Sequence, residues 1–204
     1  MTSTSLPATT ELDPALLGRL TGLMDEGAEI WNRFDHEVRQ HHWHPFVAAD
    51  YDRVLRALLP LRAPGLRFLE WGSATGIITI MADLLGFEAY GIELDAALVD
   101  TARGLADKYG SKARFAAGSF LPAGYVWRAA DGDVRRGTIG QGISAYRELG
   151  LPLDEFDLVY GYPWTGEEPM MRDLMRAYGR PGARLIVHGG SEGVRIYTNG
   201  RPES

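Results

Sequence analysis

Apolar residues recur at helical spacing through the first part of the chain. Asp13 and Pro14, a pair typical of a helix start, precede five of them: Leu16, Leu17, Leu20, Leu23 and Met24. Two more periodic segments predict helices over about 28–40 and 48–61. Pro45 lies between these segments and interrupts them, because a proline disfavours helical backbone at the residue before it. The pattern therefore predicts an N-terminal part built from helices.

Beyond this part, short apolar runs alternate with helical segments. Strands are expected at 66–71, 89–93, 113–117, 156–160, 184–188 and 194–198. Helices are expected at 75–85, 95–109 and 167–178. Alternating strands and helices predict an α/β fold, in which a doubly wound, mostly parallel sheet carries helices on both faces. Residues 189–204 have room for one convincing strand, so a shortened C-terminal strand region is expected.

This pattern divides the chain into a tail, a cap and an α/β domain. Residues 1–10 are rich in Ser and Thr, and we expect a disordered tail there. Residues 11–64 form the helical cap, which makes a single structural unit with the α/β domain over 65–204. A glycine-containing stretch over 121–154 separates the third and fourth strands and indicates an insertion or lid, with a helix over 143–149.

Composition narrows the function classes. The 204 residues include no cysteine, which excludes disulfide scaffolds, thiolate metal sites and cysteine nucleophiles. The net charge of −6 disfavours nucleic acid as a partner bound through a basic face. No apolar run approaches the roughly 20 residues of a membrane span, and the N-terminus lacks the pattern of a signal peptide. We therefore expect a cytoplasmic protein with no membrane partner.

The strongest chemical signal spans 68–78, where a predicted strand runs through a turn into a helix. Gly72 and Gly76 allow the backbone to turn sharply and to approach a ligand closely. In open α/β sheets, ligands bind at the carboxyl ends of the strands. Glu93 ends the next predicted strand, where a carboxylate can accept both ribose hydroxyls of a nucleoside.

Charge indicates which nucleoside this turn favours. The dinucleotide fingerprint needs a second and a third glycine, but Ala74 and Ile77 occupy those positions. Glu70, two residues before the first glycine, would repel a pyrophosphate and suits a cationic ligand. S-adenosylmethionine carries an ammonium and a sulfonium group and no phosphate. It is therefore favoured over a nicotinamide dinucleotide.

Glu70-x-Gly72-x-x-x-Gly76 followed by Glu93 resembles motifs I and II of the class I, seven-strand S-adenosylmethionine-dependent methyltransferases, over about 66–188. The resemblance implies a Rossmann-like methyltransferase fold and transfer of the methyl group by in-line displacement. It also implies that Glu70 and the turn hold the methionine portion, while Glu93 binds the ribose. The cofactor-binding residues expected on this basis are Glu70, Gly72, Ser73, Ala74, Gly76, Glu93, Leu94, Ser119, Phe120 and Tyr160.

The residues after the fourth predicted strand, Gly161-Tyr162-Pro163-Trp164, look like the motif IV region of that family, beside the transferring methyl. Members that methylate DNA bases or glutamine have Asn/Asp-Pro-Pro-aromatic there, so the side chain that would accept from the amine is missing here. We therefore expect a small-molecule or protein-lysine acceptor. A shorter segment, 45–51, is similar to the loop that folds over the cofactor in non-SET lysine methyltransferases. The candidate catalytic residues are Tyr162, Trp164 and Glu167.

Other functions stay open beside this one. A methyltransferase fold without turnover would be a binding module, and a Rossmann sheet could also serve an NAD(P)-dependent oxidoreductase. Four histidines gather in the cap, but their spacing matches no zinc signature, so no metal is expected: His36, His41, His42 and His44. The sequence leaves the general base and the oligomeric state undetermined.

Overall fold

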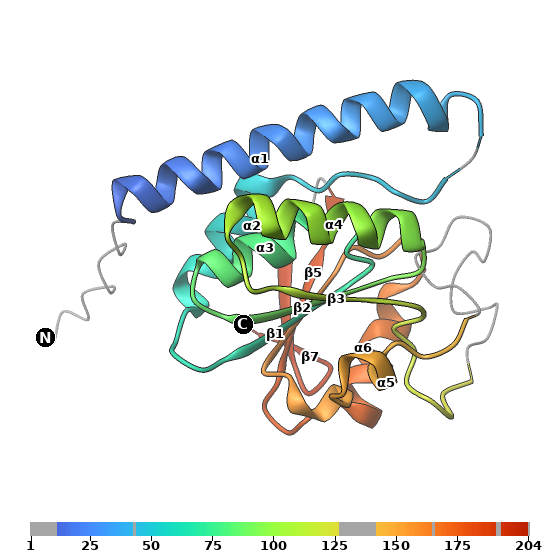
Figure 1. Cartoon of the computed structure of the whole chain (residues 1–204). Coiled ribbons are helices and arrows are strands. Elements are labelled where there is room, and N and C mark those ends of the chain that lie inside the picture. The colour runs from blue at the N-terminus through green and yellow to red at the C-terminus, as the bar shows by residue number, and fades with distance from the viewer. Residues whose placement is uncertain (1–11, 43, 127–141, 165, 191–192, 204) are drawn as a thin grey trace, which may run out of the picture.

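A seven-stranded sheet forms the centre of the computed structural model of the chain, which describes residues 12–42, 44–126, 142–164, 166–190 and 193–203 (Figure 1). The strand order is β3-β2-β1-β4-β5-β6-β7. The strands are β1 (Arg67–Trp71), β2 (Glu88–Glu93), β3 (Arg114–Ala117), β4 (Leu158–Gly161), β5 (Arg184–His188), β6 (Val194–Thr198) and β7 (Arg201–Pro202). The first five are parallel, β6 is antiparallel to β5, and β7 is antiparallel to β6. The doubly wound, mostly parallel sheet is thus confirmed. Its C-terminal strand region is short, but it holds the two-residue β7 besides the one strand that was expected.

Helices cover both faces of this sheet. They are α1 (Pro14–Phe34), α2 (Tyr51–Leu58), α3 (Ile77–Leu84), α4 (Ala96–Tyr109), α5 (Tyr146–Leu149) and α6 (Glu168–Tyr178). Figure 1 shows α1 to α4 on one side of the sheet and α5 and α6 on the other. Successive strand residues face opposite sides, so Phe68 packs in the first layer and Leu69 in the second. None of the helices within the described ranges is long and apolar enough to cross a bilayer.

The helical cap differs from its expected form. Two separate helices were predicted before Pro45, but α1 is continuous to Phe34, and a single π-helical turn, Asp35–Arg39, follows it. Gly27 does not interrupt α1, because its missing side chain lets the helix lie against α3. A Cβ atom at Gly27 would be 2.8 Å from Ile77. The next helix begins at Tyr51 and not at 48, since the Asp50 carboxylate caps it by accepting from the Arg53 N–H at 3.0 Å.

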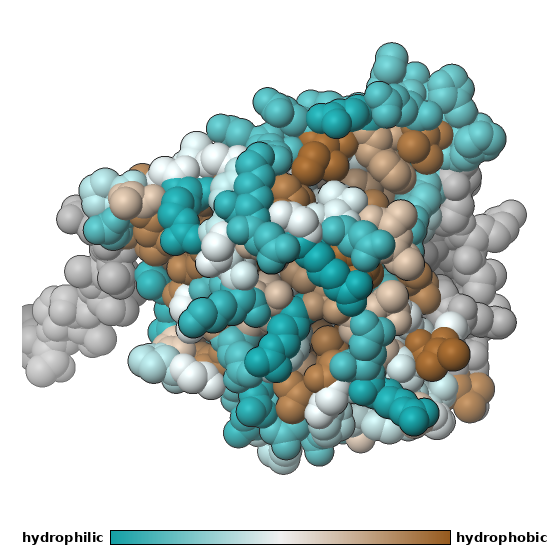
Figure 2. All heavy atoms as spheres, viewed as in Figure 1, coloured by the Kyte–Doolittle hydropathy of each residue, from teal (hydrophilic) through white to brown (hydrophobic). Residues whose placement is uncertain are grey.

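Two of the sequence predictions concern segments that lie partly or wholly outside the described residues. The expected tail, 1–10, lies outside the described residues, and so do residues 127–141 of the expected insertion. Within the described part of that insertion, the helix is shorter than expected, Tyr146–Leu149. Figure 2 shows polar side chains over most of the viewed face, with apolar side chains in scattered groups.

Two leucines of α1 should differ strongly in how much their substitution by alanine lowers the free energy of unfolding. Leu23 is fully buried in the core shared with α3, whereas Leu17 is 46% exposed. Leu23→Ala should lower the free energy of unfolding by about 2–3 kcal/mol, because it leaves a cavity in that core. Leu17→Ala should change it by less than about 0.5 kcal/mol. Urea unfolding measures both, and equal effects would contradict the packing described here.

Candidate functional site

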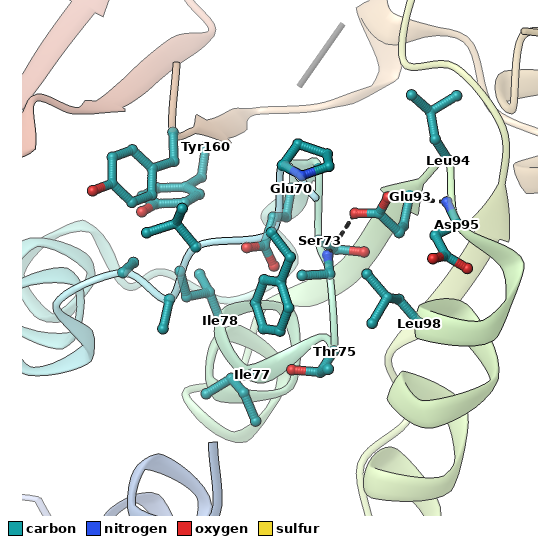
Figure 3. Close-up of a pocket in the computed structure, with 18 of the residues that line it drawn as sticks. Glu70, Ser73, Thr75, Ile77, Ile78, Glu93, Leu94, Asp95, Leu98 and Tyr160 are labelled. Carbon is teal, nitrogen blue, oxygen red and sulfur yellow. Dashed lines mark hydrogen bonds between the residues drawn. The ribbon is translucent and has the colours of Figure 1, made fainter. Parts of the chain in front are cut away.

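A cavity of about 460 Å³ lies at the carboxyl ends of β1, β2 and β4 (Figure 3). The strand order reverses between β1 and β4, and such switch points are where open α/β sheets bind ligands. Four segments line the cavity: the turn after β1, the end of β2 with the start of α4, the end of β4, and the loop 44–50 with Tyr51. In Figure 3, Glu70 and Glu93 lie in the middle of the wall, between Tyr160 on one side and Leu94 and Leu98 on the other.

The turn after β1 is held against β2 by backbone hydrogen bonds. Gly72 N–H and Ser73 N–H both donate to the Ile92 carbonyl, each at 2.9 Å. The turn has a left-handed backbone at Gly72, Ala74 and Gly76, with φ of 72°, 45° and 77°. Two of these positions carry glycine, which adopts this conformation without steric cost. Ala74 adopts it against its preference, so its conformation needs support from its surroundings.

Glu93 gives that support. One carboxylate oxygen accepts from the Ala74 N–H at 2.8 Å, and the other accepts from the Asp95 N–H at 3.0 Å. The side chain thereby joins the end of β2 to the turn after β1. Burial raises the pKa of Glu93, while the backbone donors favour its charged form. Each carboxylate oxygen has a second lone pair, so Glu93 keeps acceptor capacity for a ligand in the cavity.

Glu70 lies below the turn and caps α3. The N-terminal cap residue of α3 is Gly76, which has no side chain to accept from the helix amides. Glu70 replaces it, since one carboxylate oxygen accepts from the Thr79 N–H at 2.9 Å and from the Thr79 hydroxyl at 2.5 Å. Burial raises the pKa of Glu70 to about 8, and the nearby charge of Glu93 also raises it.

Three tyrosines gather around the end of β4. The Tyr160 side chain is 1% exposed, and its hydroxyl has no hydrogen-bond partner in the described part of the chain. Burial raises the pKa of Tyr160 well above its ordinary value, and Glu70, Tyr162 and Tyr51 are close enough to contribute. The phenol therefore stays neutral. Tyr162 packs on the His188 ring, with 4.6 Å between ring centroids.

The loop 44–50 forms the remaining wall. The His44 ring joins this loop to the start of α4, because its Nε2 lies 3.3 Å from an Asp95 carboxylate oxygen. Its Nδ1 accepts from the Phe46 N–H at 3.1 Å, which leaves Nε2 as the nitrogen that donates to Asp95. The ring also packs edge-on against Phe34. The cap and the sheet thus enclose the cavity together.

Most residues that the sequence singled out meet at this cavity. Nine of them line it: Glu70, Gly72, Ser73, Ala74, Glu93, Leu94, Tyr160, Tyr162 and Trp164. Gly76 belongs to the same turn, but its α-carbon faces the Phe115 ring and Ala102 and not the cavity. Among the described residues, no three or more His, Cys, Asp or Glu side chains lie close enough together to hold a metal ion.

Three predicted site residues do not line this cavity: Ser119, Phe120 and Glu167. Phe120 stacks on Trp71 at 5.1 Å in the opposite apolar layer, so it is not a wall of the cavity. Ser119 is buried, and its backbone pairs with Ile143 and Ala145. Glu167 is also buried, and its carboxylate accepts from the Trp164 N–H at 2.9 Å. Its described role is to hold the loop after β4, because a buried carboxylate needs such a donor.

Sequence reasoning did not select Thr79 or His188. Tyr51 ends the segment 45–51 that was expected to fold over the cofactor, and 45–49 and Tyr51 line the cavity. Thr79 lies in α3, and its hydrogen-bond partner, Glu70, belongs to β1. His188 could have been noticed as a polar residue that ends an apolar strand. It is 2% exposed, and burial lowers its pKa.

Comparison with known proteins places this site in context. No protein-family model matches the chain, and no curated protein is similar to it in sequence. The similar solved structures include methyltransferases. One is an RNA methyltransferase from Salinibacter ruber in complex with S-adenosyl-L-homocysteine, at 20% identity and a TM-score of 0.49, with 70% of this chain and 76% of that chain covered.

Two further similar structures are methyltransferases as well. A SAM-dependent methyltransferase from Thiobacillus denitrificans, in complex with S-adenosyl-L-homocysteine, is 20% identical, with a TM-score of 0.47 and coverage of 78% of this chain and 54% of that one. A precorrin-6y C5,15-methyltransferase from Geobacter metallireducens is 14% identical, with a TM-score of 0.47 and coverage of 69% and 63%. The chain thus spans between about half and two thirds of these two proteins.

Proposed function

We propose that this protein binds S-adenosylmethionine in the cavity at the switch point and transfers its methyl group to an acceptor. The observation that carries the proposal is the position of two carboxylates, the buried Glu70 and the half-buried Glu93, under one glycine-containing turn. Glu93 braces the turn from the end of β2, and Glu70 caps α3 beneath it. Together they give the cavity wall an acidic character that suits a cationic nucleoside.

The same geometry argues against a nicotinamide dinucleotide. A dinucleotide site places its pyrophosphate at the free N–H groups of the helix that follows the first strand. Here the Thr79 N–H in the first turn of α3 already donates to Glu70. A phosphate at that helix end would meet a carboxylate and lose the donor. Ala74 adds a side chain where the dinucleotide fingerprint has its second glycine.

The lining residues fit each part of the proposed cofactor. Glu93 keeps lone pairs for ribose hydroxyls, and the apolar Leu94 and Leu98 line the same side of the cavity (Figure 3). Glu70 lies on the side of the turn that faces the β4 tyrosines, and its ionised form would favour the sulfonium and ammonium groups. When bound, S-adenosylmethionine supplies an electrophilic methyl group. The protein binds and orients both partners and excludes water, which is sufficient for a displacement reaction.

Calorimetric titration tests the proposal directly. S-adenosylmethionine and S-adenosylhomocysteine should each bind the purified protein, and NAD should not. Binding of the first two ligands, followed by transfer of radiolabelled methyl groups into a cell lysate, would support an enzyme. Binding without any transfer would favour a non-catalytic binding module. If neither ligand binds, the proposal is wrong.

The raised pKa of Glu70 predicts that the affinity for S-adenosylmethionine depends on pH. A sulfonium favours the carboxylate form of Glu70. The fraction of Glu70 in this form increases with pH and approaches its maximum once the pH exceeds the pKa of about 8. The association constant should therefore rise between pH 6 and 8, by up to about tenfold per pH unit, and level off above pH 8. Titrations at several pH values measure this dependence.

Glu70→Gln is the matched control for the pH dependence. Its amide oxygen can still accept from Thr79, so the cap of α3 is kept, but the side chain no longer titrates. The variant should bind S-adenosylmethionine with a nearly constant affinity over this pH range. A slope that persists unchanged in the variant would assign the titration to another group.

A further inference from the structure

The end of the cavity beside β4, formed by Tyr51, Tyr160, Tyr162 and Trp164, is called the aromatic end here. It contains a buried polar atom without a described partner, the Tyr160 hydroxyl. A buried hydroxyl without a hydrogen bond is costly and is rare in folded proteins. Tyr160 pairs with Glu70 across the β1–β4 register, so its side chain starts next to the carboxylate that faces the cofactor space. This hydroxyl is thus placed to meet a ligand.

The charges around the cavity restrict the ligand. Among the described lining residues, the ionisable groups other than tyrosine are Glu70, Glu93, Asp95 and His44, and no lysine or arginine is present. An acceptor that carries a carboxylate or a phosphate would therefore meet like charges without a described cation to balance them. A neutral acceptor, or one that arrives as a cation, meets no such penalty. Aromatic rings also attract cations.

The three carboxylates that line the cavity, and Glu167 beside it, each accept a hydrogen bond from a backbone N–H. Glu70 accepts from Thr79, Glu93 from Ala74 and Asp95, and Glu167 from Trp164. Asp95 accepts from Ala97 and pairs with His44. His188 packs behind Tyr162 and is not itself a lining residue. A hydroxyl acceptor would need a base to remove its proton, whereas a neutral amine attacks with its own lone pair.

We propose, on the basis of the proposed function, that the methyl acceptor is a primary or secondary amine and that the Tyr160 hydroxyl accepts a hydrogen bond from its N–H. An acceptor that arrives as an ammonium first gives one proton to water, because only the neutral amine has a lone pair for attack. The amine nitrogen then forms a bond to the methyl carbon, and the carbon–sulfur bond breaks with its electron pair going to sulfur. The positive charge moves from sulfur to nitrogen, and the product leaves as a methylated ammonium. Tyr160 thereby takes the place of the amine-accepting side chain that the motif after β4 lacks.

Three ligands of one shape test the acceptor class. Benzylamine, benzyl alcohol and benzoate differ in their amine, hydroxyl and carboxylate groups. In the presence of S-adenosylmethionine, benzylamine should be methylated, and the other two should not be. In the presence of S-adenosylhomocysteine, benzylamine should bind more tightly than benzoate in a calorimetric titration. Methylation of benzyl alcohol or benzoate at an equal or higher rate would overturn the proposal, and so would the absence of methylation of both benzylamine and Nα-acetyl-lysine amide by a protein that binds S-adenosylmethionine.

Tyr160→Phe tests the role of the hydroxyl, because it removes one oxygen and keeps the ring. The kcat/KM for benzylamine should fall about 5- to 10-fold, the loss expected for one hydrogen bond. The affinity for S-adenosylhomocysteine should change less than about twofold. Tyr178→Phe, on the opposite layer of the fold, is the matched control and should leave kcat/KM unchanged. Equal kcat/KM values in Tyr160→Phe and the wild-type protein would assign the hydroxyl no role in acceptor binding.

A second experiment distinguishes two sources of the amine, a lysine side chain and a small free amine. Nα-acetyl-lysine amide offers the same amine on a longer and more flexible chain, and comparison of its kcat/KM with that of benzylamine distinguishes a lysine acceptor from a compact free amine. Both results support an amine acceptor. Failure of the protein to bind S-adenosylmethionine or S-adenosylhomocysteine would overturn the proposed function itself. Binding of the cofactor with a preference for a non-amine acceptor would overturn only this inference.

Discussion

Glu93→Ala is expected to weaken the binding of S-adenosylmethionine by about 100-fold. The carboxylate would accept two ribose hydroxyls, and each hydrogen bond to a charged group contributes about 1.5 kcal/mol or more, so their joint loss corresponds to about two powers of ten. The substitution also removes the acceptor of the Ala74 N–H at 2.8 Å, which supports a left-handed alanine in the turn. Both effects act in the same direction. Calorimetric titration measures the change.

Glu88→Gln is the matched control for this loss. Glu88 begins the same strand at its amino end, away from the cavity, and it pairs with Arg67 on the surface. Its substitution should leave the affinity for S-adenosylmethionine unchanged within about twofold, since exposed ion pairs contribute little. Wild-type affinity in Glu93→Ala would contradict the ribose-binding role. The urea midpoint of each variant shows whether the fold is retained.

Gly76→Ala is expected to destabilise the folded protein by about 2–5 kcal/mol. Gly76 has φ of 77°, and a left-handed conformation costs a residue with a side chain about 1–2 kcal/mol. An added Cβ atom would also lie 2.7 Å from the Phe115 ring and 2.8 Å from Ala102. Overpacking of this kind costs a further 1–3 kcal/mol. Urea unfolding measures the sum, and a purified variant that is already unfolded agrees with the upper end of the range.

Gly110→Ala separates the two costs. Gly110 also has a left-handed backbone, with φ of 60°, but its added Cβ atom would find only Arg19 within 4 Å, at 3.8 Å. It should therefore lose about 1–2 kcal/mol from backbone strain alone. An equal loss in Gly76→Ala and Gly110→Ala would show that the contact between the turn and α4 is looser than described.

Several parts of the fold could be predicted from local patterns. β5 and β6 have the bounds that their apolar runs indicated, and α4 ends at Gly110 as its glycine predicted. These elements have strong local signals, because a buried strand of a parallel sheet is a continuous apolar run and a left-handed glycine ends a helix. The order of strands and helices was then enough to predict a doubly wound sheet.

The first helix shows where local patterns are insufficient. The apolar periodicity indicated a second, separate helix from about residue 28. The structure retains one helix there, since the missing side chain allows close contact with Ile77 and Tyr51. The stabilising contacts of Gly27 come from residues that are distant in sequence. The sequence of the first helix alone therefore cannot indicate them.

The candidate site divides in the same way. The sequence by itself determined that Glu70, the turn from Gly72 to Gly76 and Glu93 lie at adjacent strand ends, because consecutive parallel strands bring their carboxyl ends together. Only the tertiary structure decided where two other predicted site residues lie. The Phe120 and Glu167 side chains are buried, and neither lines the cavity. The direction of a side chain beyond a strand end depends on packing with other segments, and no local pattern of apolar residues specifies that packing.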